Sequence, residues 1–142
     1  MRPRVFDLDS GGILKRYKSI AIVGLSRNED KYSHIVAKFM MSAGYMIIPV
    51  NPSAEGKILG KRVYRNLNGL KDKLEMVDVF RPDTEALEIT KSAVINGAKV
   101  VWLQEGIVNE EAKRYAESHN VMFIQDKCIM KEYIRMAEID GP

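Results

Sequence analysis

Short apolar runs alternate along the chain with stretches in which apolar residues recur every three or four positions. The first run, from Ser19 to Gly24, is almost continuously apolar, which is typical of a strand buried on both faces. Similar runs predict further strands over 45–50, 76–80, 99–103 and 121–125. The spaced stretches between the runs predict helices over 33–43, 82–97, 109–119 and 129–139.

Shorter segments stand outside this alternation. Asp9 or Ser10 is suited to cap a short helix before the first strand. Residues 53–65 predict a lid-like loop or a short hairpin, and residues 67–73 predict a short helix. The whole pattern predicts an α/β protein with a Rossmann-like, doubly wound parallel sheet of about five strands in a three-layer αβα arrangement. We expect a single domain over 1–142, with its core at about 15–132.

Composition narrows the classes of partner. The net charge of +3, without a dense Lys/Arg run, does not predict nucleic-acid binding but suits a small polyanion. We expect no membrane partner, because no segment approaches about 20 apolar residues, and the first seven residues lack the apolar stretch of a signal peptide. One cysteine and two histidines predict neither a disulfide framework nor a zinc site, and the chain is predicted to be cytoplasmic.

The loop after the first strand is the first candidate site, because ligands of such sheets bind beyond the carboxyl ends of the strands. Gly24 allows a tight turn and a close backbone approach. Backbone N–H groups, the hydroxyls of Ser26 and Ser33, and the start of the next helix together form an anion site, with Ser33 as the expected N-cap. Arg27 and Lys31 add positive charge. The alternative is a strand-to-helix turn that binds nothing.

The same loop lacks the usual nucleotide fingerprints. Neither G-x-G-x-x-G nor G-x-x-x-x-G-K-[ST] is present, and the second strand ends in Val50-Asn51-Pro52 without the carboxylate that holds the ribose of NAD. A neutral strand end suits a nucleotide whose ribose carries a phosphate. Basic residues in the next loop would neutralise that phosphate or are solvated surface charges: Lys57, Lys61 and Arg62.

Sequence blocks in a fixed order point to a family. They are Ile22–Ser26, Tyr45–Pro52, Val77–Pro82, Val101–Ile107 and Asp126–Ile129. Together they resemble the small stand-alone CoA-binding proteins of the YccU type, which are similar to the CoA-binding N-terminal domain of the succinyl-CoA synthetase α subunit. The resemblance covers about residues 15–132 and implies that coenzyme A is the ligand.

The resemblance also implies roles for individual residues. The Gly24-Leu25-Ser26 turn, with Lys31 and Ser33, would hold the pyrophosphate region of coenzyme A. The adenosine end would lie against Asn51 and Pro52. The pantetheine arm would run along Phe80-Arg81-Pro82, and Gln104 would close the far side of the cleft. The chain departs from the family at Tyr32, where proline is common, and at Glu105, where neutral or hydrophobic residues are common.

No set of nucleophile, base and acid can be assembled from the sequence. His34 and His119 have no evident partners and are expected at the surface or at helix ends. Cys128 is expected at the start of the last helix, where the helix dipole favours a thiolate. It is either a small buried hydrophobic residue or a redox thiol that forms a mixed disulfide with coenzyme A.

Side chains within the predicted strands are expected to be structural. We expect Trp102, Met46 and Met76 in the core, and Asp78 near a sheet edge or bonded to a neighbouring loop. The leading functional hypothesis is a non-catalytic carrier, sensor or subunit-like module that binds coenzyme A or an acyl-CoA. The alternatives are a thiol/disulfide redox protein acting through Cys128 and an NAD(P)-binding Rossmann domain. A protein partner or a homo-oligomer remains open for each of them.

Overall fold

The computed structural model describes residues 8–140, with the backbone alone for Asp140. Residues 1–7 lie outside the described residues. They are the segment in which the sequence predicts no signal peptide. Within the described range, the helices are too short or too polar for any of them to cross a membrane.

Five parallel strands form the central sheet, in the order β2-β1-β5-β6-β7. Their bounds are β1 (Ser19–Val23), β2 (Met46–Val50), β5 (Met76–Val79), β6 (Val100–Leu103) and β7 (Met122–Ile124). Counted within this sheet alone, the order is 2-1-3-4-5, one of the two common doubly wound arrangements. The strand order reverses between β1 and β5, so ligands are expected at the carboxyl ends of these two strands.

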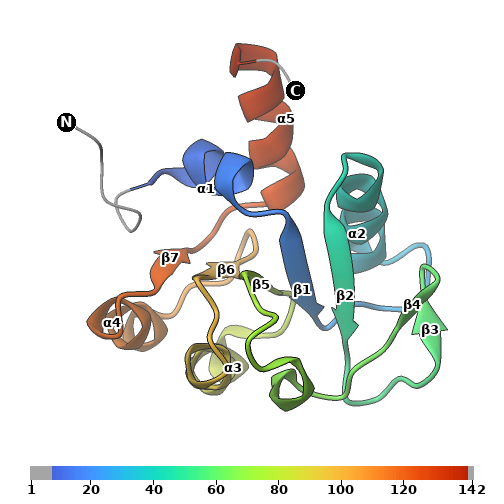
Figure 1. Cartoon of the computed structure of the whole chain (residues 1–142), viewed down its shortest axis with the longest axis horizontal. Helices are drawn as coiled ribbons and strands as arrows, with labels where there is room; N and C mark the ends of the chain where they lie inside the picture. The colour runs from blue at the N-terminus through green and yellow to red at the C-terminus, as the bar shows by residue number, and fades with distance from the viewer. Residues whose placement is uncertain (1–7, 141–142) are drawn as a thin grey trace.

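Helices cover both faces of the sheet, which confirms the three-layer αβα prediction (Figure 1). One layer holds α1 (Ser10–Arg16), α2 (Tyr32–Ser42) and α5 (Ile129–Asp140), and the other holds α3 (Asp83–Ile95) and α4 (Glu110–Ser118). Alternate residues of β1 pack against the two helix layers, because successive side chains of a strand point to opposite faces. Ile20 and Ile22 belong to the core under α2 and α5, whereas Ala21 and Val23 belong to the core over α3.

The connection from β2 to β5 contains a small hairpin, one of the two structures predicted for this segment. Strands β3 (Lys57–Ile58) and β4 (Lys61–Arg62) pair antiparallel, and a 3-10 helix follows at Leu67–Leu70. Just after the hairpin, Tyr64 continues beside the end of β2, where its N–H donates to the Pro49 carbonyl at 2.9 Å. The hairpin is thereby held next to the carboxyl ends of the strands.

The helix starts follow local hydrogen bonding. Asp9 caps α1 as predicted, with its carboxylate accepting the Gly12 N–H at 2.8 Å. The predicted N-cap of α2 is wrong, because the helix begins at Tyr32 with Lys31 in the cap position. Ser33 lies inside the first turn, and its hydroxyl accepts a hydrogen bond from the Ser26 N–H of the preceding loop instead of capping the helix.

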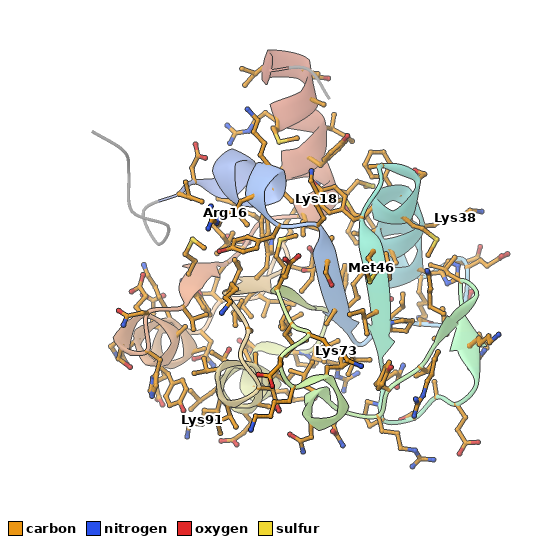
Figure 2. The ribbon with its side chains drawn as sticks, in the orientation of Figure 1. Arg16, Lys18, Lys38, Met46, Lys73 and Lys91 are labelled. Carbon is orange, nitrogen blue, oxygen red and sulfur yellow. The ribbon has the colours of Figure 1, made fainter. Side chains whose placement is uncertain are left out.

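Burial confirms some of the expected core residues and corrects others. Trp102 and Met76 are fully buried, whereas Met46 is 58% exposed (Figure 2). Met46 starts the edge strand β2, and the helices of its face pack over β5, β6 and β7 instead. Asp78 lies on the central strand β5 and is fully buried without a partner, not at an edge or bonded to a loop. His34 is at a helix start as expected but is only 5% exposed.

Candidate functional site

The carboxyl ends of the strands bring the predicted site residues to one rim of the sheet. Gly24, Leu25 and Ser26 follow β1, and Asn51 and Pro52 follow β2. Phe80, Arg81 and Pro82 follow β5, and Gln104 follows β6. Because all five strands are parallel, these segments lie on the same side of the molecule, across the point where the strand order reverses.

A cleft of about 360 Å³ opens at this rim. Four of the predicted site residues line it, namely Gly24, Asn51, Pro52 and Arg81. The cleft also contains residues that the sequence did not single out: Val23, Val50, Ser53, Arg65, Asn66, Leu67, Glu85, Glu88, Ile89 and Ser92. Glu85, Ile89 and Ser92 are spaced so that they lie on one face of α3. Because the sequence predicts this helix directly after Pro82, the helical spacing is the signal that could have identified them as part of the cleft wall.

Gly24 is required at the turn by both its conformation and its surroundings. Its φ of +93° lies in a region that favours glycine, and its N–H donates to the Val50 carbonyl at 2.8 Å. A Cβ at this position would lie 3.0 Å from the Phe80 carbonyl oxygen and 2.9 Å from Cδ of Arg81. The loops after β1 and β5 therefore touch through the backbone of Gly24.

Side chains from neighbouring elements tie down the rest of this turn. The Ser26 N–H donates to the Ser33 hydroxyl at 3.0 Å, and the Ser26 carbonyl lies 2.8 Å from Nδ1 of His34. Nδ2 of Asn51 donates to the Leu25 carbonyl at 3.0 Å, and the Leu25 side chain is fully buried. The predicted pyrophosphate loop is thus fixed by bonds within the protein, and the Ser26 N–H already has a partner in this conformation.

Two arginines around the rim are engaged with protein groups. Arg27 donates to the backbone carbonyls of Lys57 and Glu55, which attaches the loop after β1 to the β3–β4 hairpin. Arg65 pairs with the Glu55 carboxylate at 2.6 Å. Lys31 is exposed at the cap of α2.

Arg81 makes the one two-pronged ion pair of the cleft lining. It donates to both carboxylate oxygens of Glu85, at 3.1 and 2.8 Å, and this hydrogen bonding lowers the pKa of Glu85. Both partners are partly exposed, so the pair contributes little to stability and can exchange for a ligand anion. The lining thus holds two arginines, Arg65 and Arg81, and two carboxylates, Glu85 and Glu88, and each arginine is in an exposed ion pair that a ligand anion can replace.

Phe80 and Gln104 lie beside the cleft, near the starts of α2 and α5, whereas Pro82 is in the N-cap position of α3. The Tyr32 hydroxyl lies 2.9 Å from Sγ of Cys128, and the rings of Tyr32 and Phe80 are 6.4 Å apart. Burial and then the contact with Cys128 raise the pKa of Tyr32. The side-chain carbonyl of Gln104 accepts the Ile129 N–H at 3.1 Å. Tyr32 was noted in the sequence only as a departure from the family, so its contact with Cys128 was not foreseen.

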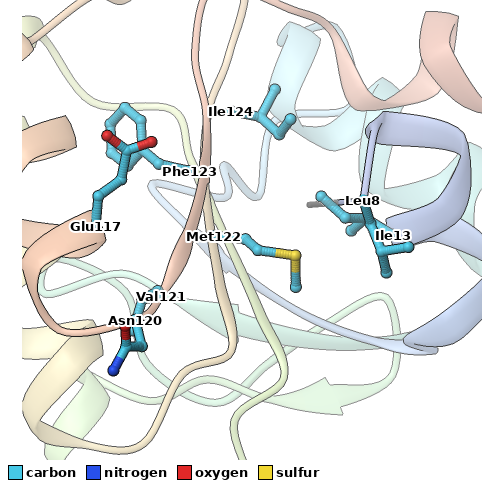
Figure 3. Close-up of a pocket in the computed structure, with 8 residues that line it drawn as sticks. All are labelled: Leu8, Ile13, Glu117, Asn120, Val121, Met122, Phe123 and Ile124. Atoms are coloured by element: carbon cyan, nitrogen blue, oxygen red, sulfur yellow. The ribbon is translucent and has the colours of Figure 1, made fainter. Parts of the chain in front are cut away.

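Another pocket, of about 240 Å³, lies along the opposite edge strand β7 (Figure 3). Its wall combines residues in and before β7 with the end of α4 and with Leu8 and Ile13 at the start of the described chain. It includes none of the predicted site residues. Among the described side chains, no group of three or more His, Cys, Asp or Glu residues is placed to hold a metal ion. The rim at β1, β2 and β5, whose cleft is lined by predicted residues, is the candidate site.

Known proteins resemble this chain over most of its length. YneT of Bacillus subtilis (strain 168) is 39% identical over 117 residues, which make up 82% of this chain and 86% of that protein. A hypothetical protein from Pyrococcus horikoshii OT3 has the same fold, with a TM-score of 0.85 at 34% identity over 96% of this chain and 97% of the other. The match to the ADP-forming acetate–CoA ligase of Methanocaldococcus jannaschii, 26% identical over 133 residues, covers 84% of this chain but only 18% of the ligase.

A family match covers the fold and the rim together. Residues 18–134 match the family described as CoA binding domain. This range contains all five strands of the parallel sheet and every residue that the sequence assigned to the ligand. The family match and the close structural agreement with the Pyrococcus protein together confirm the resemblance to stand-alone CoA-binding proteins and the Rossmann-like α/β fold. The chain belongs to the CoA binding domain family.

Proposed function

We propose that this protein binds coenzyme A or an acyl-CoA, as a non-catalytic carrier, sensor or subunit-like module. The observation that carries the proposal is the cleft at the ends of β1, β2 and β5, which joins Gly24, Asn51, Pro52 and Arg81 in a chain of this family. The nucleotide end of the ligand would occupy this cleft. The pantetheine arm would leave it past Phe80, toward Gln104.

The chemistry of the cleft suits an anionic nucleotide. Pro52, Leu67 and Ile89 offer apolar surface to an adenine ring. Arg65 and Arg81 offer positive charge to phosphates when they exchange their partners Glu55 and Glu85 for the ligand. Asn51 leaves the end of β2 neutral, so a phosphate on the ribose meets no carboxylate there. A role as one module of a larger system is supported by the ligase of Methanocaldococcus jannaschii. This chain corresponds to only 18% of that protein, so a domain of this kind also occurs as a small part of a larger enzyme.

Calorimetric titration tests this proposal with three ligands: coenzyme A, 3′-dephospho-CoA and NADH. We expect coenzyme A to bind with the highest affinity and NADH with the lowest. Arg81→Gln should weaken coenzyme A binding by about 10- to 100-fold, the effect of losing a hydrogen bond from a charged group. Arg114→Gln on α4 makes the same change of charge away from the cleft and serves as the control. Preferential binding of NADH would instead support the NAD(P)-binding alternative.

A second candidate function is favoured by the position of Cys128. Cys128 is 2% exposed and directly precedes α5, and its Sγ contacts the Tyr32 hydroxyl on the same rim as the cleft. In this alternative the Cys128 thiolate attacks the disulfide of oxidised coenzyme A. The protein–CoA disulfide forms, and one coenzyme A thiolate leaves. For this exchange to occur, coenzyme A disulfide must reach Cys128, which is buried in the structure.

Mass spectrometry under non-reducing conditions separates the two candidates. After incubation with coenzyme A disulfide, the redox alternative requires one adduct of coenzyme A mass, which Cys128→Ser abolishes. A protein that binds coenzyme A but forms no adduct is the non-catalytic module. Cytoplasmic residence and the presence of a protein partner or a second copy stay predictions.

A further inference from the structure

Two buried polar side chains at the ligand end of the sheet have atoms without hydrogen-bond partners. Asp78 is fully buried, and neither of its carboxyl oxygens has a partner. Gln104 is 3% exposed, and its amide nitrogen is unpartnered although its amide oxygen accepts the Ile129 N–H. Buried polar groups in folded proteins are nearly always paired, so two such groups close together need an explanation.

Strand register places both side chains on the same face. Asp78 of β5 lies opposite Trp102 of β6, and Gln104 stands two residues beyond Trp102. The Gln104 N–H donates to the Val79 carbonyl at 3.2 Å, so the strand pairing continues to this point. Since side chains alternate along a strand, Asp78 and Gln104 are diagonal neighbours that face the layer of α2 and α5.

An aromatic pair lies on the same side of the sheet as these two side chains. Tyr32 begins α2, Cys128 directly precedes α5, and the hydrogen bond between them spans the gap between the two helices. Phe80, at the end of β5, packs beside the Tyr32 ring and against the core. Burial and the contact with Cys128 raise the pKa of Tyr32 most, and the carboxyls of Glu105 and then Asp78 add smaller contributions from within electrostatic reach. Tyr32 is 43% exposed and so stands at the surface of this layer.

The unpartnered atoms define what kind of group would fit. Burial raises the pKa of Asp78 well above its ordinary value, which favours the uncharged acid, both a donor and an acceptor. The Gln104 amide nitrogen is a donor. A charged group would be penalised in this apolar surrounding, whereas a secondary amide offers one carbonyl acceptor and one N–H donor. The pantetheine arm of coenzyme A contains two secondary amides.

We propose that Asp78 and Gln104 form a buried recognition site for a secondary amide of the pantetheine arm, reached past Tyr32. The amide carbonyl accepts a hydrogen bond from the Gln104 nitrogen, and the amide N–H donates to the Asp78 carboxyl oxygen. The inference rests on the proposed binding of coenzyme A. It adds to that function a specific contact for the part of the ligand that carries the thiol.

The test compares coenzyme A with its nucleotide half, adenosine 3′-phosphate 5′-diphosphate, which has no pantetheine arm. Gln104→Met removes the amide nitrogen at similar volume, and Asp78→Leu removes the carboxyl. Each should weaken coenzyme A binding about tenfold or more, with no change for the nucleotide half. Asp78→Asn keeps a donor and an acceptor and should stay within about threefold of the wild type. Thr90→Val is the matched control, because Thr90 on α3 also buries an unpartnered oxygen and belongs to the other layer.

The outcomes separate this inference from the function on which it rests. If the wild type binds coenzyme A and Gln104→Met binds it equally well, the amide site is refuted and the proposed function stands. If neither ligand binds the wild type, the proposed function itself is wrong. Far-UV circular dichroism identifies a variant that fails to fold; if Asp78→Leu does so, Gln104→Met and Asp78→Asn decide the question.

Discussion

Alanine at Gly24 should destabilise the protein by more than the change of backbone conformation alone explains. The φ of +93° costs a side-chain-bearing residue about 1–2 kcal/mol. The new Cβ would also lie 3.0 Å from the Phe80 carbonyl oxygen, a backbone atom that cannot move without shifting the end of β5. Forcing an extra methyl group into such a contact costs about 1–3 kcal/mol. We therefore expect Gly24→Ala to lose about 2–5 kcal/mol, a large part of the stability of a typical domain.

Gly44 provides the matched control for this prediction. Its φ of +100° is close to that of Gly24, yet a Cβ there would meet no atom within 4 Å. Gly44→Ala should therefore lose only the conformational part, about 1–2 kcal/mol. The difference between the two variants isolates the contact with the loop after β5.

Urea unfolding measures both variants. Trp102 is the single tryptophan and is fully buried, so its fluorescence reports loss of the core. With a slope of about 1–3 kcal/mol per M of urea, the two variants should differ in midpoint by roughly 1 M. Equal midpoints, or a lower midpoint for Gly44→Ala, would refute the reasoning that the close approach to Phe80 makes glycine necessary at Gly24.

Other predictions concern single side chains. The folded-state pKa of Asp78 is raised above its ordinary value of 3.8, so its contribution to stability is full below that pH and is lost as the pH rises through the folded pKa. The free energy of unfolding of the wild type should thus fall relative to Asp78→Asn as the pH rises above the ordinary value of 3.8, and a pH-independent difference would contradict this. Tyr45→Phe leaves the Leu14 carbonyl without its 2.6 Å hydrogen bond and should cost about 1–3 kcal/mol in the same urea assay. Glu55→Gln removes an exposed ion pair with Arg65 and should change stability by less than about 1 kcal/mol; a larger loss would show that the pair does more than surface pairs usually do.

The sequence predicted the fold well because its strongest signals are local. Continuous apolar runs indicate strands buried on both faces, and all five predicted strands are present. The order of the strands depends on long-range packing, and the two wrong predictions for strand residues follow from it. The exposed Met46 follows from the edge position of β2, and the buried Asp78 follows from the central position of β5.

The site was predictable as a set of loops but not as a set of contacts. Parallel strands bring their carboxyl ends together, so the segments around Gly24, Asn51 and Arg81 could be assigned to one rim before the structure was known. The sequence did not indicate that Arg27 would bind the hairpin carbonyls or that Tyr32 would reach Cys128. Both contacts join segments far apart in the chain, and no periodic pattern records such pairs.

The position of β1 inside the sheet has a consequence for how the chain assembles. Ile20 pairs on one side with Ile47 of β2 and on the other with Met76 of β5. During synthesis β2 emerges soon after β1, whereas β5 follows only after the hairpin and the 3-10 helix. In that interval the second edge of β1 has no partner, and an unpaired strand edge is a template for association with another chain. We therefore expect the pairing of β5 with β1 to close this edge and to lower the tendency of the nascent chain to associate.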